Sequence, residues 1–130
     1  MKAKRRGNET SCHFDMKERV SRILKSEGFV VLTEHKGADV VAYELEEGKA
    51  ICLEMERSFK NLKRNWKRNS ANGCEAHIVV APDEKTLKRY RSKIEERGVG
   101  GDLARIEFLN AQTIDRGSLL NAINGAKYGK

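Results

Sequence analysis

Three acidic residues in the middle of the chain have the types and spacing of a carboxylate site. Asp39 follows a glycine-containing turn, and Glu54 and Glu56 are two residues apart in an apolar run. Side chains two apart on a strand project from the same face, and facing side chains of antiparallel strands are about 5 Å apart. Such a cluster is costly without positive charge. The hard cation Mg²⁺, with Mn²⁺ as an alternative, suits its oxygens.

Apolar periodicity predicts the elements that must position these acids. Asp15 and Glu18 have the spacing of a capping box at the start of the first helix, which Gly28 ends. We expect helices over 15–27, 58–69, 82–97 and 113–123, and strands over 29–32, 39–45, 49–56, 77–81 and 105–109. This order predicts a three-layer α/β domain with a mixed central sheet.

The 130 residues have the size of one domain. We expect residues 1–14 to form a disordered basic arm, residues 15–125 a single domain, and residues 126–130 a frayed tail. The sequence has no apolar run near the 18 or so residues of a membrane helix, and its first residues lack the apolar stretch of a signal peptide. We therefore expect a cytoplasmic protein without a membrane partner.

The net charge of +7 is unevenly distributed. Residues 34–56 hold two basic and seven acidic side chains, whereas residues 57–97 hold twelve basic and five acidic ones. An acidic centre beside a strongly basic stretch predicts a polyanionic partner, and the charge pattern does not distinguish DNA from RNA.

The helix predicted over 58–69 is the main candidate for contact with a polyanion. Its stripe of Phe59, Leu62 and Trp66 is typical of a helix packed on a core, and its asparagines form a polar edge at Asn61, Asn65 and Asn69. The helix also carries five cations and no acidic residue, which favours contact with phosphates over a merely solvated face. These cations are Lys60, Lys63, Arg64, Lys67 and Arg68.

The segments Gly37–Ala42 and Ala50–Arg57 resemble the core of the PD-(D/E)XK nuclease superfamily. In that fold an aspartate opens one strand and an acid-x-lysine triplet lies on the next. Asp39 matches the aspartate and Glu54 the acid of the triplet, but Glu56 stands where the family usually has lysine. The segment from Glu18 to Leu32 is similar to archaeal Holliday junction resolvases, in which a helical glutamate, matched by Glu18, joins the metal site.

The resemblance implies a restriction endonuclease-like domain with an αβββαβ core and a metal-dependent DNA endonuclease, with branched or structured DNA as a candidate substrate. Mg²⁺ would be held by Asp39, Glu54 and the backbone carbonyl of Met55. Glu56 would be a general base or a further ligand, and Lys60 or Lys63 would replace the missing lysine. We expect a homodimer, because such a small nuclease must cut two strands. The alternative is a non-catalytic nucleic-acid-binding module on the same fold, which Glu56 favours.

The cysteines offer a second, weaker possibility. Cys74 and His77 have a spacing that can hold zinc, and Cys12 and His13 could complete four ligands. The sequence disfavours zinc, because adjacent Cys and His are poor ligand geometry and His77 begins an apolar strand. We take the cysteines as free thiols, and Cys52 as a small buried apolar residue.

Overall fold

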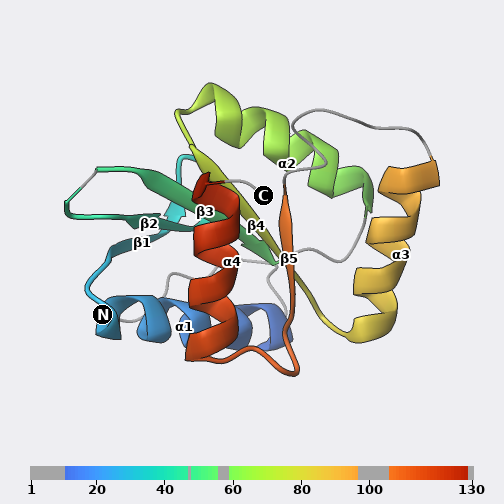
Figure 1. Cartoon of the computed structure of the whole chain (residues 1–130), viewed down its shortest axis with the longest axis horizontal. Coiled ribbons are helices and arrows are strands. Elements are labelled where there is room, and N and C mark those ends of the chain that lie inside the picture. Colours follow the sequence, from blue (N-terminus) through green and yellow to red (C-terminus); the bar gives the residue numbers. More distant parts are fainter. Residues whose placement is uncertain (1–10, 47, 56–58, 97–105, 129–130) are drawn as a thin grey trace.

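The computed structural model describes residues 11–46, 48–55, 59–96 and 106–128. Four helices surround a five-stranded sheet (Figure 1), so the predicted α/β class with a mixed sheet is confirmed. In chain order the elements are α1 (Ser11–Ser26), β1 (Val30–His35), β2 (Ala38–Tyr43), β3 (Ala50–Met55), α2 (Phe59–Ala71), β4 (Ala76–Ala81), α3 (Glu84–Glu96), β5 (Glu107–Asn110) and α4 (Arg116–Tyr128).

The sheet joins an antiparallel meander to a parallel half. Its strands lie in sequence order. β1 pairs with β2 and β2 with β3 in antiparallel fashion, whereas β3 pairs with β4 and β4 with β5 in parallel. Parallel neighbours need a crossover connection, and α2 and α3 provide the two crossovers.

The alternation of side chains along the central strands divides the core between two faces of the sheet. Ile78 and Val80 pack in one cluster with residues of α1 and α4, whereas Val79 and Ala81 pack in another with residues of α2 and α3. Because neighbouring strand residues point to opposite faces, α1 and α4 cover one face and α2 and α3 cover the other. Ile51, Leu53 and Met55 of β3 pack with the residues of α1 and α4.

The two ends of the described chain are more helical than expected. α1 begins at Ser11 rather than at Asp15, so residues 11–14 are helical and not part of a disordered arm. α4 runs to Tyr128, into the predicted frayed tail, because buried Ala126 packs on the core. Residues 1–10 and 129–130 of those two predictions lie outside the described residues.

A reciprocal cap fixes the start of α4. The Asp115 side chain accepts a hydrogen bond from the backbone N–H of Ser118 (2.8 Å), and the Ser118 hydroxyl accepts one from the N–H of Asp115 (3.0 Å). The bond from the Ser118 backbone lowers the pKa of Asp115. This cap explains why the helix starts at Arg116 rather than at residue 113.

No helix within the described ranges has both the length and the apolar character needed to cross a membrane.

Truncation of Leu53 tests the central core. Leu53 is fully buried on β3, whereas Leu45 in the connection between β2 and β3 is 73% exposed. We expect Leu53→Ala to lower the free energy of unfolding by about 2–5 kcal/mol and the matched control Leu45→Ala by no more than about 0.5 kcal/mol. Urea denaturation measures both, and equal losses would contradict this placement of the core.

Candidate functional site

The sheet brings Asp39 and Glu54 to one end of two paired strands. Val40 pairs with Leu53 in the antiparallel register of β2 and β3, and continuing that register by one residue sets Asp39 opposite Glu54. Both side chains are buried, with residue exposures of 1% and 5%. Asp39 and Glu54 are therefore buried at the same end of two neighbouring strands, and their carboxyl groups have partners in different helices.

The carboxylate of Asp39 is held between β3 and α1. Its Oδ2 accepts a hydrogen bond of 2.8 Å from the backbone N–H of Met55, and the same oxygen lies 3.2 Å from Nε2 of His13. The bond to Met55 fixes Asp39 next to the peptide that follows Glu54. A protonated His13 would also offset its charge.

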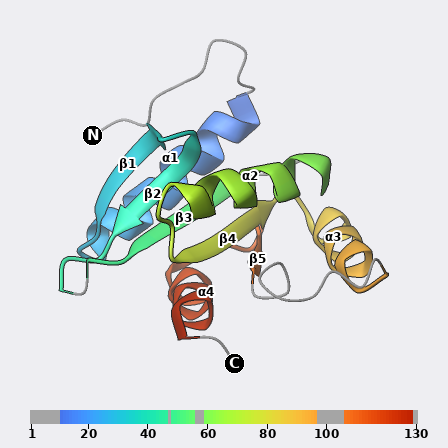
Figure 2. The same ribbon diagram turned by 90° about the horizontal axis from the view of Figure 1, so that it is seen from above.

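The carboxylate of Glu54 is held by α2, which lies across β3 and β4 (Figure 2). Its Oε2 accepts a hydrogen bond of 2.7 Å from the side-chain amide of Asn69 and one of 3.2 Å from the guanidinium of Arg68. Asn69 is thus a buried partner of Glu54 rather than part of an outward polar edge. Since a buried carboxylate is costly without compensation, α2 stabilises Glu54 in its ionised form.

α1 also buries a lysine, Lys17, one helical turn after His13. Lys17 is fully buried, and its Nζ donates a hydrogen bond of 3.0 Å to Oε2 of Glu34 and lies 5.7 Å from the centre of the Phe14 ring. His13 and Lys17 are four residues apart and so share one face of the helix. Their spacing with the buried Val20 and Leu24 could have revealed this inward face, but the predicted arm over residues 1–14 hid it.

The other predicted site residues lie elsewhere. Glu18 forms an ion pair of 3.7 Å with Arg22, and the α1 residue that contacts Asp39 is His13. Lys60 is exposed in the first turn of α2, and the α2 cation that contacts a carboxylate of the pair is Arg68. Glu56, the residue at the position of the family lysine, lies outside the described residues.

The remaining predicted nucleic-acid contacts form an exposed row on α2. The members of this row, all exposed to solvent, are Lys60, Lys63, Arg64 and Lys67. Arg64 also donates a hydrogen bond of 2.7 Å to the side chain of Asn61. Arg68 differs from them, because its guanidinium reaches inward to Glu54 while its side chain stays 38% exposed.

The donor set of this site consists of hard oxygens. Asp39, Glu54 and the backbone carbonyl of Met55 are the kind of ligand that Mg²⁺ prefers. The described part of the chain contains no group of three or more His, Cys, Asp or Glu side chains positioned to hold a metal ion. The chemistry of the two carboxyl groups suits a hard metal ion.

The fold and the site define a three-layer α/β domain with a buried carboxylate pair at one end of two central strands. Comparisons with protein-family models, with curated proteins and with solved structures give no match for this chain. The resemblance to the PD-(D/E)XK superfamily stays a prediction from the residues.

Gly37 allows Arg68 to approach the turn between β1 and β2. Its φ of +85° is left-handed, and a Cβ at this position would lie 2.7 Å from Nε of Arg68. Among the described residues that nitrogen is buried without a hydrogen-bond partner, although the side chain as a whole is 38% exposed. Close packing at Gly37 therefore helps to direct Arg68 toward Glu54.

Substitution of Gly37 tests this packing. We expect Gly37→Ala to lower the free energy of unfolding by more than the 1–2 kcal/mol or so of left-handed strain alone, because the new methyl group displaces Arg68. Gly73→Ala is the matched control, since Gly73 has a similar φ of +91° and a Cβ added there would meet no atom within 4 Å. Urea denaturation compares the two, and equal costs would show that Arg68 does not pack against Gly37.

Proposed function

We propose that this protein is a metal-dependent DNA endonuclease that hydrolyses phosphodiester bonds. The observation that carries the proposal is that two acidic residues, Asp39 and Glu54, are both buried at the same end of the paired strands β2 and β3. Burying two such groups costs free energy, and a role in binding a cation accounts for that cost. The fold proposed here is the restriction endonuclease-like one.

Asp39, Glu54 and the Met55 carbonyl would hold Mg²⁺ or Mn²⁺, which when bound lowers the pKa of a water molecule and offsets charge on the phosphate. The chain's own contribution is orientation. The backbone N–H of Met55 and the side chain of Asn69 each occupy one oxygen of a carboxylate. Such outer partners fix how a carboxylate faces its metal.

Arg68 is our candidate for the cation that the sequence lacks at position 56. It is the α2 cation found beside Glu54, and it is partly exposed. A guanidinium at this place can hydrogen-bond a phosphate oxygen and offset the charge that develops during hydrolysis. The predicted alternatives, Lys60 and Lys63, are exposed on the same helix.

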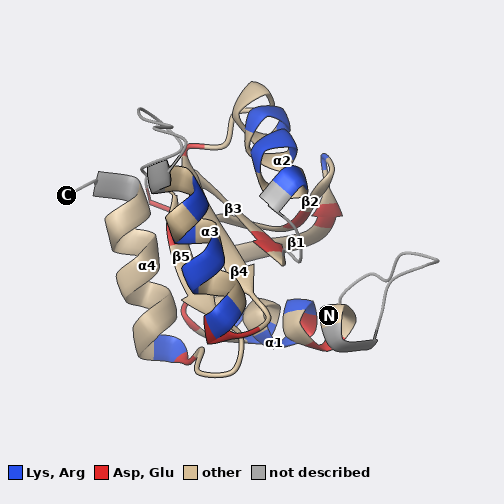
Figure 3. Ribbon diagram, turned by 90° about the vertical axis from the view of Figure 1, so that its right-hand side faces the viewer, with Lys and Arg blue, Asp and Glu red and all other residues tan. Residues whose placement is uncertain are grey.

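The charge of the surface beside the site supports a nucleic-acid partner. Lys and Arg lie along both α2 and α3 (Figure 3). The exposed cations of α3 are Lys85, Lys88, Arg89 and Arg91. Two neighbouring basic helices on one face of the sheet suit a phosphate backbone, and we propose DNA bound by a homodimer, with RNA as the competing ligand.

A non-catalytic nucleic-acid-binding module is the second candidate. Glu56 replaces the usual lysine, and Oε2 of Glu54 already has two protein partners, Asn69 and Arg68. In this reading the carboxylates hold α1 and α2 in place, and the basic helices bind nucleic acid without cutting it.

Cleavage assays separate the two candidates. We expect Mg²⁺-dependent cutting of four-way-junction, linear duplex or single-stranded DNA that EDTA abolishes. Asp39→Asn and Glu54→Gln should each reduce the rate by about a hundredfold or more, because each removes an anionic ligand oxygen. Glu46→Gln, at an exposed position, is the control and should cut normally. Salt-sensitive binding without cutting under Mg²⁺ or Mn²⁺ would support the binding module, and absence of both activities would reject both candidates.

Charge reversal on α2 tests the docking surface. We expect the combined change of Lys60, Lys63, Arg64 and Lys67 to Glu to weaken duplex DNA binding. Each lost phosphate contact should flatten the slope of log K against log salt by about 0.9. The same reversal of Lys85, Lys88, Arg89 and Arg91 on α3 is matched in charge and should have the smaller effect, because α2 is the helix that contacts Glu54. Titration by fluorescence anisotropy at several salt concentrations measures both, and an unchanged slope for the α2 variant would exclude α2 as the docking surface.

A further inference from the structure

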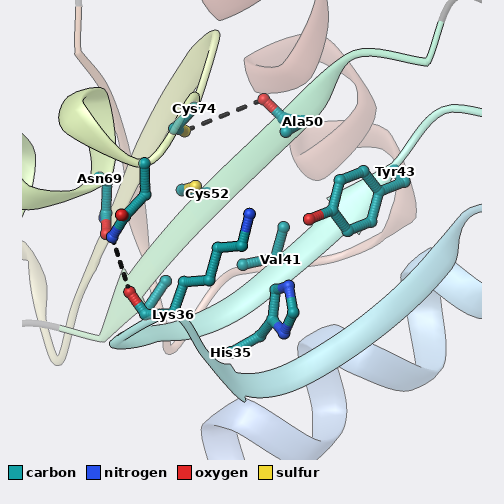
Figure 4. Close-up of a pocket in the computed structure, with 10 residues that line it drawn as sticks. His35, Lys36, Val41, Tyr43, Ala50, Cys52, Asn69 and Cys74 are labelled. Atoms are coloured by element: carbon teal, nitrogen blue, oxygen red, sulfur yellow. Dashed lines mark hydrogen bonds between the residues drawn. The ribbon is translucent and has the colours of Figure 1, made fainter.

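Two thiols lie together beneath the C-terminal end of α2, on the same face of the sheet as Glu54. Cys52 is buried on β3, and Cys74 is partly buried in the connection between α2 and β4. Both line one small pocket with Val41, Tyr43 and Asn69 (Figure 4). The fold thus brings two free cysteines that are far apart in the sequence to the same pocket.

The two side chains are in direct contact. Cys52 and Val41 are buried in one small cluster, and the partly buried Cys74 packs against it. The thiol of Cys74 is held in place by backbone carbonyl groups, because its sulfur lies 2.9 Å from the carbonyl oxygen of Ala76 and 3.9 Å from that of Ala50.

The surroundings make the two thiols chemically unequal. The hydrogen bond from Cys52 is the largest cause that lowers the pKa of Cys74, to about 6, and His77 lowers it further while burial opposes both. His77 lies on β4 as the register partner of Cys52. These neighbours favour the thiolate form of Cys74, which is also the more exposed of the two cysteines. These are the properties of a cysteine that reacts with oxidants.

We propose that Cys52 and Cys74 form a peroxide-sensitive dithiol, in which Cys74 is the attacking residue and Cys52 the resolving one. The Cys74 thiolate attacks one oxygen of hydrogen peroxide, the O–O bond breaks, and the departing hydroxide takes up a proton to form water. The Cys52 sulfur then attacks the sulfur of the resulting Cys74 sulfenic acid, the S–O bond breaks, and a second water leaves. The two thiols are oxidised to one disulfide, and the peroxide is reduced to two waters.

The disulfide would fasten β3 to the end of α2. The backbone N–H of Cys74 already donates a hydrogen bond of 2.9 Å to the carbonyl of Asn69, whose side chain holds Glu54. A covalent link at this point would fix the last turn of α2 over the carboxylate pair. Formation of the disulfide does not depend on nuclease activity, so its test is separate from that of the proposed function.

The decisive experiment maps the oxidised cysteines in the folded, full-length protein. After brief treatment with hydrogen peroxide, we expect the intact mass to fall by two hydrogen atoms and a peptide digest to contain Cys52 linked to Cys74. Cys12→Ser should behave in the same way, because Cys12 takes no part. In Cys52→Ser the reagent dimedone should label Cys74 as a sulfenic acid, whereas in Cys74→Ser residue 52 should stay reduced.

Three results would overturn the proposal. The first is a disulfide that includes Cys12. The second is a pair of thiols that stays reduced in the folded wild-type protein under conditions that fully oxidise the urea-unfolded chain, a comparison that needs no substitution. The third is one equivalent of bound Zn²⁺ that protects both thiols and is lost in His77→Ala, which would assign these residues to a metal site.

Discussion

Two acidic side chains buried at one end of the central strands constrain much of the structure around them. Asp39 and Glu54 are almost inaccessible to water, so each needs hydrogen bonds or positive charge from the protein. β3 and α1 provide these for Asp39 through Met55 and His13, and α2 provides them for Glu54. α1 and α2, on opposite faces of the sheet, thus both contact the same end of β2 and β3.

α2 serves both as a cover for the sheet and as the basic surface of the domain. Its buried side includes the apolar Leu62 as well as the polar Asn65 and Asn69. Its exposed side is a row of lysines and arginine with Arg68 at the boundary between the two. The same helix can thus orient a carboxylate below it and contact a phosphate backbone above it, which links the proposed site to the proposed docking surface.

Asn69 connects this site with the thiol pair. Its side chain donates to Glu54, and its backbone carbonyl accepts from the N–H of Cys74. A change at Cys74 would therefore act on the last turn of α2 and, through that turn, on the geometry of Glu54. Since only one residue separates Cys52 from Glu54 on β3, the dithiol and the carboxylates share both a strand and a helix.

The sequence by itself determined the order and type of the elements and the two faces of β3, because periods of 2.0 and 3.6 residues are local properties. It also indicated that Asp39 and Glu54 belong together. The tertiary structure decided that His13 contacts Asp39, that Arg68 and Asn69 hold Glu54, and that Cys52 meets Cys74. Such contacts depend on the rotation of α1, on the angle at which α2 crosses the strands and on the register of distant segments. Those quantities are set by packing of the whole core, which no local pattern contains.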